Sequence, residues 1–298
     1  MPQDFAAPLP HNALLAISGD DAPAFLHGQF TNDVEALAVG AAQWNGWCSP
    51  KGRLLATFLL VRRAEGFLLM LPAELAAPIA KRLAMFVLRS KVTIRDVSAE
   101  HALWGLAGEA ALRSVGAPAP LKAVAQEGRL VVALDGSRAV VIAPAGSSLE
   151  GLARGTTHDW DRELIHAGIP VITLATQDAF VPQMANFELV GGVSFKKGCY
   201  PGQEIVARTQ YRGILKRRMA FAHIDSPAQP KAGDAVYAPA FGDQAAGMIV
   251  NAAPSSDGTG FDFLVVAQLE SLAAGELHLG SPQGPAIRIV SHPAAQAA

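Results

Sequence analysis

The chain has too few cysteines to build a disulfide scaffold or a metal-cluster site of its own. Only Cys48 and Cys199 occur among its 298 residues, whereas a cluster held by one chain takes about four thiolates. Their spacing neither supports nor forbids a bridge, and bridges are rare in a reducing compartment. The cysteine content therefore fits a cytoplasmic protein.

A strong charge of one sign and a long apolar run are also absent. The 24 basic and 26 acidic residues leave a formal net charge of -2, so no global positive field would attract nucleic acid or an anionic membrane. The apolar runs at residues 54–61 and 66–71 are far shorter than the roughly 20 residues of a membrane helix. The first residues lack the basic segment and apolar run of a secretory signal. We expect a soluble cytoplasmic protein without a membrane partner and without direct nucleic-acid binding.

Several common site motifs are missing as well. The sequence holds no phosphate-binding loop, no paired-histidine zinc motif, no dinucleotide fingerprint and no cluster of cysteine and histidine ligands. It gives no positive case for a bound nucleotide, and we predict no metal ligands.

The composition that remains is that of a globular protein. Half of the residues are hydrophobic and 17% are charged, which excludes the pattern of a disordered chain. The length allows two or three packed units. The sequence predicts a short helix that ends before Gly28, a hairpin of strands at 54–61 and 67–71, and an amphipathic helix over 75–88 whose packed face includes Phe86 and Val87. Further strands are expected at 92–97, 103–106, 130–134 and 139–142.

The pattern of apolar and turn residues changes after residue 214. Short apolar runs at 219–224, 235–237, 246–250, 261–266 and 287–290 are separated by turn residues, which is typical of a small β-barrel. Only residues 269–277 favour a helical turn, and the tail after His292 is expected to be frayed. We predict an α+β region over residues 1–214, made of two subdomains, and a C-terminal β-barrel over 215–298.

The segment from Lys196 to Glu204 combines a thiol, a cation, glycines and polar side chains. Lys197 stands two residues before Cys199 and would lower the pKa of the thiol if both side chains faced one cavity. Gln203 and Glu204 supply an amide and a carboxylate, which suit the donor–acceptor edge of a pterin or a similar heterocycle. The alternative is a glycine-proline loop with a buried cysteine and a helix that starts near Gly202, and this is the commoner fate of an isolated cysteine.

The string from Lys197 to Glu204 resembles the signature of the YgfZ-type folate-binding proteins. These belong to a superfamily that also holds the T protein of glycine cleavage, and their mitochondrial counterparts are iron-sulfur assembly factors. The resemblance extends over residues 25–34, 49–56, 167–170, 180–183, 191–195 and 207–208, with Asn186. It covers nearly the whole chain, although the C-terminal part is similar only in texture.

The resemblance implies a ring-like aminomethyltransferase-type α+β fold. In that fold, two ferredoxin-like α+β portions build a channel for tetrahydrofolate or a reduced derivative, and a C-terminal β-barrel closes one side. It implies that function depends most on Lys197 and Cys199. The residues that it implies for folate binding are Thr31, Asn32, Asp33, Asn186, Lys197, Tyr200, Gln203 and Glu204.

Two departures from the superfamily pattern concern activity. The T protein uses an aspartate to help transfer a one-carbon unit, but the matching stretch here holds Leu55 and Ala56, which offer neither charge nor a proton acceptor. A standard aminomethyl transfer is therefore not expected. His166 stands where relatives often carry an acid, and we weigh a neutral structural donor above a pH-sensitive channel residue.

A local basic stretch precedes and enters the barrel. Its members are Arg208, Arg212, Lys216, Arg217 and Arg218. It could meet a polyglutamate tail, RNA or an acidic protein, and a solvated linker explains it equally well.

Three functions remain open at this stage. The leading one, implied by the resemblance, is a folate-dependent accessory protein for assembly or repair of iron-sulfur clusters in client enzymes, including enzymes that modify tRNA. Its partners would be folate and iron-sulfur client or assembly proteins, with Cys199 as a redox-competent or transient ligand thiol. The second is a folate-dependent aminomethyl or one-carbon transferase with an unknown acceptor. The third is a scaffold that folate merely stabilises.

Overall fold

The computed structural model describes residues 4–213, 215–226 and 229–292, which form two compact units. Unit 1 comprises Met1–Trp47, Ala56–Trp160 and Gly191–Pro201. Unit 2 comprises Cys48–Leu55, Asp161–Val190 and Gly202–Ala298. The chain therefore crosses between the units more than once. The predicted boundary falls on residue 214, which lies outside the described residues, and it stays a prediction.

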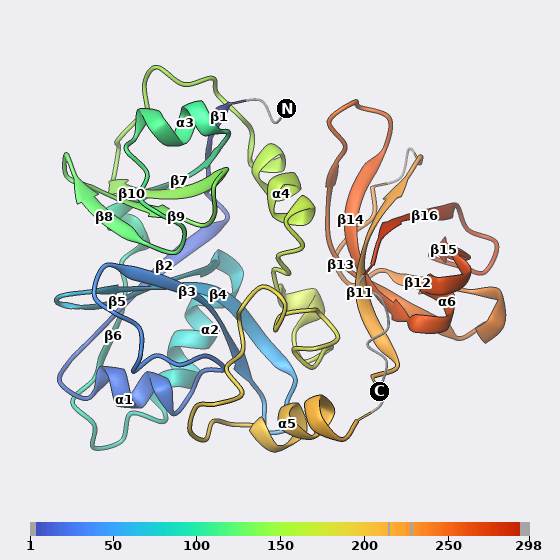
Figure 1. The fold of residues 1–298 in the computed structure, drawn as a ribbon, viewed down its shortest axis with the longest axis horizontal. Coiled ribbons are helices and arrows are strands. Elements are labelled where there is room, and N and C mark those ends of the chain that lie inside the picture. The colour runs from blue at the N-terminus through green and yellow to red at the C-terminus, as the bar shows by residue number, and fades with distance from the viewer. Residues whose placement is uncertain (1–3, 214, 227–228, 293–298) are drawn as a thin grey trace. The chain divides into compact units, whose positions relative to one another are not determined.

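The first sheet of unit 1 has five antiparallel strands in the order β1-β7-β10-β9-β8 (Figure 1). The strands are β1 (Phe5–Pro8), β7 (His101–Ala107), β8 (Ala123–Gln126), β9 (Arg129–Ala133) and β10 (Arg138–Pro144). Asp135 Oδ1 accepts hydrogen bonds from the amides of Ser137 and Arg138 and so closes the β9–β10 turn. This hairpin was predicted, whereas β1 and β8 were not.

The second sheet has the order β3-β4-β5-β2-β6. Its strands are β2 (Asn12–Ser18), β3 (Ala41–Cys48), β4 (Leu54–Arg63), β5 (Gly66–Pro72) and β6 (Thr93–Asp96). Every residue of β4 from Leu54 to Val61 is buried, which explains its unbroken apolar run. Gly66 adopts φ 139, and a Cβ there would collide with the carbonyl oxygen of Ile17. The predicted hairpin of β4 and β5 is confirmed.

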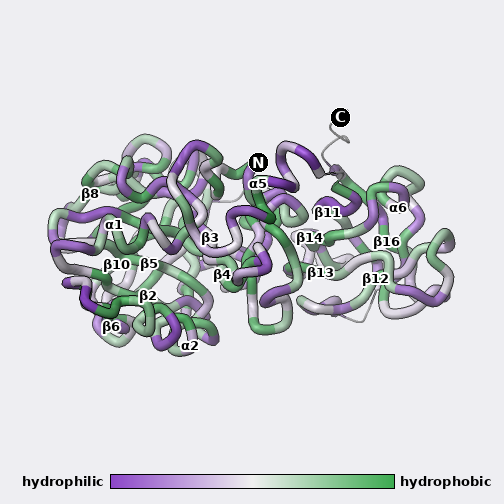
Figure 2. Tube along the Cα trace, turned by 90° about the horizontal axis from the view of Figure 1, so that it is seen from below, coloured by the Kyte–Doolittle hydropathy of each residue, from purple (hydrophilic) through white to green (hydrophobic). Residues whose placement is uncertain are grey.

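The helices of unit 1 are short. They are α1 (Ala22–His27), α2 (Ala73–Ala84), η1 (Ser98–Glu100), α3 (Glu109–Ser114) and the start of α4 (Thr157–His166). The hydropathy along the chain in Figure 2 shows hydrophobic and hydrophilic segments in alternation, as amphipathic elements require. Helix α1 ends at His27 before Gly28, as predicted.

The prediction of a helix over 75–88 was wrong at its end. Helix α2 stops at Ala84, and the amide of Phe86 bonds back to the carbonyl of Leu83, three residues earlier, so that the chain tightens into a turn. Leu88 then adopts a left-handed φ of 47. Phe86 is 45% exposed, and it does not belong to the packed face of the helix.

Unit 2 contains a closed barrel in the order β11-β14-β13-β12-β15-β16. Its strands are β11 (Arg217–Ile224), β12 (Ala235–Tyr237), β13 (Ala245–Pro254), β14 (Phe261–Gln268), β15 (Leu277–Leu279) and β16 (Ala286–Ser291). Ala220, Ala222, Phe263 and Val265 belong to the barrel core, so the alternate residues of β11 and β14 face outward. The predicted barrel is confirmed.

The remaining elements of unit 2 are helical. They are the end of α4, η2 (Leu174–Thr176), α5 (Gln203–Tyr211), η3 (Pro239–Phe241) and α6 (Leu269–Ala274). Helix α5 begins directly after Gly202, as the glycine-proline-loop alternative predicted. The buried cysteine of that alternative was wrong, because Cys199 is exposed. The helical turn expected over 269–277 is shorter, because Leu277 already belongs to β15. The tail expected to fray, after His292, lies outside the described residues.

Candidate functional site

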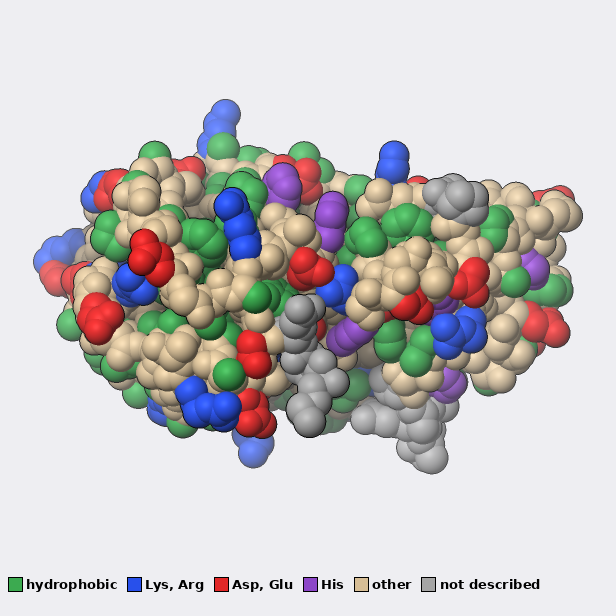
Figure 3. Space-filling view, turned by 90° about the horizontal axis from the view of Figure 1, so that it is seen from above, with side chains coloured by type: hydrophobic (Ala, Val, Ile, Leu, Met, Phe, Trp, Pro, Cys, Tyr) green, Lys and Arg blue, Asp and Glu red, His purple; other side chains and the backbone are tan. Residues whose placement is uncertain are grey.

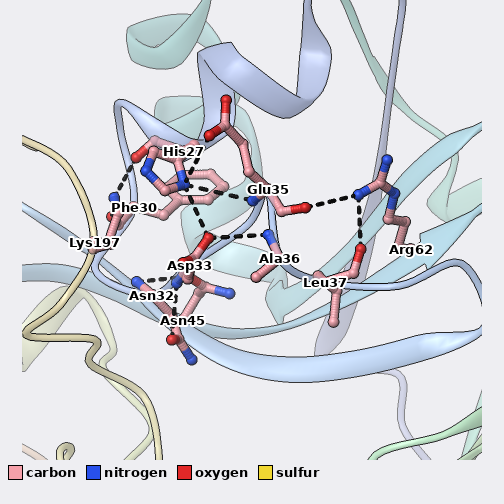
Figure 4. Close-up of polar contacts among 10 residues, drawn as sticks. All are labelled: His27, Phe30, Asn32, Asp33, Glu35, Ala36, Leu37, Asn45, Arg62 and Lys197. Carbon is pink, nitrogen blue, oxygen red and sulfur yellow. Dashed lines mark hydrogen bonds and ion pairs between the residues drawn. The ribbon is translucent and has the colours of Figure 1, made fainter.

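The Lys197 side chain is buried at the centre of the candidate site in unit 1 (Figure 4). Its Nζ donates to the carbonyl oxygen of His27 and, at 2.7 Å, to that of Phe30. The same atom lies 4.8 Å from the centroid of the Tyr200 ring. These three contacts fix the ammonium at the end of α1.

Burial dominates the protonation of Lys197. It lowers the pKa of the amine to about 8, against the opposing attraction of Asp33, Glu35 and Cys199. The amine therefore changes charge near physiological pH. Cys199 itself is exposed, so the segment presents an accessible thiol beside a buried, titratable cation.

The loop after α1 is held by its own polar groups (Figure 4). His27 Nδ1 lies 3.2 Å from Asp33 Oδ1, and the same oxygen accepts the amide of Ala36 at 3.0 Å. The amide of Asp33 donates to Asn32 Oδ1 at 2.9 Å. Such local bonds from Asx side chains stabilise turns that a helix could not continue.

Thr31 and Asn32 join this loop to the segment that carries Lys197. Thr31 Oγ1 donates to the carbonyl of Gly192 at 2.7 Å and accepts the amide of Gly46 at 2.8 Å. Asn32 Nδ2 donates to the carbonyls of Trp44 and Gly191 at 2.9 and 2.7 Å. Both side chains are thus engaged by backbone groups. Their predicted role in folate binding stays a prediction.

Strand β3 carries three polar atoms that sequence reasoning missed. Gln43 Nε2, Asn45 Nδ2 and Trp47 Nε1 are buried and have no hydrogen-bond partner among the described residues. Because they stand at every second position, these side chains share one face of the strand. Buried donors are rarely left unpaired in proteins. The alternation of Gln43, Asn45 and Trp47 in the sequence was the signal that could have found them.

A second group of predicted residues belongs to unit 2. Asn186 adopts a left-handed φ of 53; its Nδ2 donates to the carbonyl of Met219 at 2.8 Å and its Oδ1 accepts from Arg218 at 3.2 Å. Gln203 and Glu204 form the first turn of α5, where Glu204 is exposed. The structure therefore brings Thr31, Asn32 and Asp33 together with Lys197 and Tyr200 within unit 1, and places the other three in unit 2.

Two glycines bring two segments of unit 2 into close contact. Gly202 adopts φ 79 and Gly52 adopts φ 68. A Cβ on Gly202 would lie 2.6 Å from both the nitrogen and the Cα of Gly52, so neither position has room for a side chain. Next to them, Ser49 Oγ donates to Asp178 Oδ1 at 2.7 Å. Cys48 is buried there, and burial raises the pKa of its thiol.

The basic stretch is not a continuous cationic surface. Arg218 is buried and forms an ion pair with Glu188, and its guanidinium also donates to the carbonyl of Gln183 at 3.1 Å. Burial raises the pKa of Glu188, although Arg218 opposes this shift. Arg218 is therefore neither part of a solvated linker nor free to bind a polyglutamate tail, RNA or an acidic protein.

Charges of both signs are interspersed on the face drawn in Figure 3, in keeping with the small net charge of the chain. Within residues 4–213, 215–226 and 229–292, no group of three or more His, Cys, Asp or Glu side chains is placed to hold a metal ion. No helix in these ranges is both long and apolar enough to cross a membrane.

Comparison with known proteins gives consistent results. The chain is 33% identical to the tRNA-modifying protein YgfZ of Shigella sonnei over 240 residues, which are 74% of this chain and 72% of that protein. It is 33% identical over 235 residues to the protein of the same name from Edwardsiella ictaluri, covering 73% and 70% of the two chains. No protein-family model matches.

Among solved structures, the chain is similar to the glycine cleavage system aminomethyltransferase T of Bartonella henselae. The TM-score is 0.77 over 97% of this chain and 86% of that one, at 16% identity. At this identity the likeness shows the fold alone. The expected aminomethyltransferase-type fold with a C-terminal β-barrel is confirmed.

Proposed function

Because the chain belongs to the YgfZ family of tRNA-modifying proteins, we propose that it binds a reduced folate and supports assembly or repair of iron-sulfur clusters in client enzymes. These clients include enzymes that modify tRNA, and the setting is the cytoplasm. The observation that carries the proposal is the pairing of Lys197, whose amine is buried, with the exposed thiol of Cys199.

The unpaired donors of β3 fit a folate. A pterin ring offers carbonyl and ring-nitrogen acceptors, and Gln43 Nε2, Asn45 Nδ2 and Trp47 Nε1 are donors without partners among the described residues. Gln29 Oε1, a buried acceptor without a partner there, would meet an N–H group of the same ring. A bound reduced folate would supply a one-carbon group or reducing equivalents.

Cys199 serves the cluster chemistry in this proposal. A thiolate is a soft ligand that suits iron-sulfur clusters, which would be cargo or client groups here. The ammonium of Lys197 attracts the thiolate, since Cys199 is among the groups that oppose the lowering of the lysine pKa.

A one-carbon transferase is the alternative, and the likeness to an aminomethyltransferase fold is what favours it. Leu55 and Ala56, at the positions where the superfamily pattern expects an acid, are buried in β4. A transferase built on this chain would need another acid.

Complementation tests the proposal. Cells that lack the protein are given the wild type, Cys199→Ala or Cys48→Ala, and the product of an iron-sulfur tRNA-modifying enzyme is quantified in their tRNA. We expect Cys199→Ala to fail and Cys48→Ala, which removes the buried thiol, to restore the product. Full rescue by Cys199→Ala would refute the role of the thiol.

A further inference from the structure

The chain leaves helix α2 in an exposed apolar turn, residues 85–88, which we call the tip. Met85 and Phe86 are 62% and 45% exposed, and Leu88 is 88% exposed. The other exposed large hydrophobic residues of the described chain stand apart from one another in the sequence. Single exposed apolar side chains are normal, whereas a group of them marks an interaction surface.

The backbone of the tip makes the exposure of Leu88 costly. The amide of Ser90 donates to the carbonyl of Val87 at 2.8 Å and closes a turn, in which Leu88 adopts a left-handed φ of 47. A bulky side chain is rare in this conformation, and glycine or asparagine is the usual choice there. Contacts within the fold do not explain a strained leucine that is almost fully exposed to solvent.

Basic side chains flank the tip on both sides in the sequence. The segment 75–95 holds no acidic residue, and its bases are Lys81, Arg82, Arg89, Lys91 and Arg95. Lys91 forms an ion pair with Asp20, and Arg95 forms one with Glu100. The three bases nearest to the tip, at positions 81, 82 and 89, are exposed and form no ion pair within the described part of the chain. The tip therefore carries a local positive charge that the net charge of the chain conceals.

The base of the tip is anchored on strand β3. The rings of Phe86 and Trp47 meet edge to face, with centroids 6.2 Å apart and an interplanar angle of 88°. The guanidinium carbon of Arg82 lies 5.6 Å from the centroid of the Trp47 ring, and Trp47 is buried. A projection that is held in place loses less conformational freedom when it binds.

We propose that the tip inserts into the surface of an anionic lipid bilayer, with Lys81, Arg82 and Arg89 on the lipid phosphates. Apolar side chains supply the insertion, and long basic side chains reach the head groups around it. A bilayer accepts a projecting side chain without a matching hollow, whereas a protein partner would need a pocket shaped for Leu88.

This surface contact goes beyond the proposed function, because neither folate binding nor cluster chemistry requires exposed apolar side chains. It departs from the expectation of a chain without a membrane partner. That expectation rested on the net charge of the whole chain, and the tip concentrates bases in one short segment.

Sedimentation of the full chain with vesicles tests the proposal. Vesicles of phosphatidylglycerol mixed with phosphatidylcholine are compared with vesicles of phosphatidylcholine alone, at low and at high ionic strength. We expect the partition coefficient to be about 10-fold or more higher on the anionic vesicles at low ionic strength, and to fall as salt is added. Equal binding to both kinds of vesicle would overturn the proposal. So would no binding to the anionic vesicles, which would leave an acidic protein as the occupant.

Leu88→Gly separates the role of the side chain from the stability of the fold. Glycine adopts a φ of 47 without strain, so thermal unfolding should show a variant at least as stable as the wild type. Its partition onto anionic vesicles should nevertheless fall about 10-fold or more, as the loss of an inserted leucine implies. Unchanged binding by Leu88→Gly contradicts insertion of the tip.

A second apolar variant has a matched control. Met85→Ser should bind anionic vesicles more weakly than the wild type. Val39→Ser changes a side chain that is similarly exposed, at 60%, but lies outside the tip, and it should bind as the wild type does. Equal losses in the two variants would refute the assignment to the tip.

Charge variants connect the preference for anionic lipid to the bases beside the tip. Lys81→Gln combined with Arg89→Gln should weaken binding to anionic vesicles by about 10- to 30-fold. Lys122→Gln combined with Arg154→Gln removes the same net charge from exposed bases elsewhere in unit 1 and should bind nearly as the wild type does. An equal loss in both double variants would show an effect of net charge alone and would overturn the proposal.

Discussion

At the scale of single residues, the chemistry of the candidate site depends on one buried amine and one accessible thiol. Lys197 donates two of its three N–H groups to backbone carbonyls. The position of the amine is therefore fixed, while its protonation state can change. Cys48 is buried, as structural cysteines are, and Cys199 is exposed, as reactive cysteines are. The two cysteines therefore serve as each other's controls.

Alkylation of Cys199 should follow the charge of Lys197. With a pKa of about 8, Lys197 is charged below pH 8 and attracts the thiolate, so wild type should react several-fold faster with iodoacetamide than Lys197→Met at pH 7. The difference should shrink above pH 9, where the amine is neutral. The rates are measured by mass spectrometry, with Cys48→Ala confirming that the modified thiol is Cys199. A rate ratio that does not change with pH contradicts the coupling.

At the same scale, the sequence singled out Lys197 and Cys199, and their functional roles stay predictions, as do those of their neighbours. Thr31 and Asn32 were placed near the folate channel, and they lie beside Lys197, but their side chains bind backbone groups. The bonds to Gly192 and Gly191 span 161 and 159 residues of sequence, and such distant partners cannot be identified from a local pattern. Gln43 and Asn45 could have been noticed, since polar side chains at alternate positions of a buried strand are unusual.

At the scale of elements, a buried ion pair joins strand β11 to the segment that carries Glu188. Arg218 of β11 pairs with Glu188, and both side chains are less than 10% exposed. Removing one partner of such a pair leaves the other charge buried and uncompensated.

Arg218→Met should therefore lower the free energy of unfolding by about 3–5 kcal/mol. The neighbouring Arg217→Met, on a partly exposed residue, should cost less than about 0.5 kcal/mol. The double variant Arg218→Met with Glu188→Leu should regain most of the loss, because no charge then stays unpaired. Urea unfolding measures all three, and a double variant as unstable as Arg218→Met would contradict the argument.

The close approach of Gly52 and Gly202 gives a second prediction for an element, the start of α5. Gly202→Ala adds a Cβ in a left-handed conformation and against Gly52, so it should destabilise the protein by about 2 kcal/mol or more. Gly136→Ala, where a Cβ meets no neighbouring atom, is the control and should change stability little. Thermal unfolding compares them, and equal midpoints would show that the loops move apart without cost.

Elements were predictable where periodicity was strong. The hairpin of β4 and β5, the start of α5 and the strands of the barrel followed from apolar runs and turn residues. The end of α2 was not predictable, because Phe86 and Val87 continue the helical spacing of apolar residues, whereas the chain has already tightened into a turn. Strands β1, β2, β3 and β8 were missed because their apolar patterns are short or mixed.

At the scale of the whole molecule, pH-dependent stability should report the pair of His223 and Asp262 on the barrel. Burial alone would lower the pKa of His223, but its hydrogen bonds with Asp262 and Asp225 outweigh burial and raise it. Burial alone would raise the pKa of Asp262, but the hydrogen bonds from His166 and His223 lower it. The contribution of His223 is therefore complete below pH 6.5 and is lost as pH rises through the raised pKa, while that of Asp262 is lost in acid.

His223→Gln should accordingly cost about 1–3 kcal/mol of unfolding free energy at pH 5.5 and clearly less at pH 9. His278→Gln serves as the matched control, since His278 contacts the carbonyl of Gly284 and no carboxylate is involved in that bond. Urea unfolding at the two pH values gives the comparison. A larger cost at pH 9 than at pH 5.5 would reverse the sign and refute the assignment.

The fold of the whole molecule followed from resemblance more than from periodicity. The pattern of short apolar runs separated the barrel from the α+β region. It could not show that residues 48–55, which interrupt the sequence of unit 1, belong to unit 2, or that residues 191–201, which interrupt the sequence of unit 2, belong to unit 1. Contacts such as that of Gly52 with Gly202 decide this division, and they are set by packing between distant segments.

Titration of the purified protein with tetrahydrofolate tests the central claim most directly. Calorimetry compares the wild type with three variants that each remove a buried donor without a partner in the described part of the chain: Gln43→Leu and Trp47→Phe in β3, and Trp104→Phe in β7. We predict that the wild type binds, that the two β3 variants bind about 2- to 10-fold more weakly, and that Trp104→Phe is unchanged. No binding by the wild type, or equal affinities in all four proteins, would contradict a folate site on this face of unit 1.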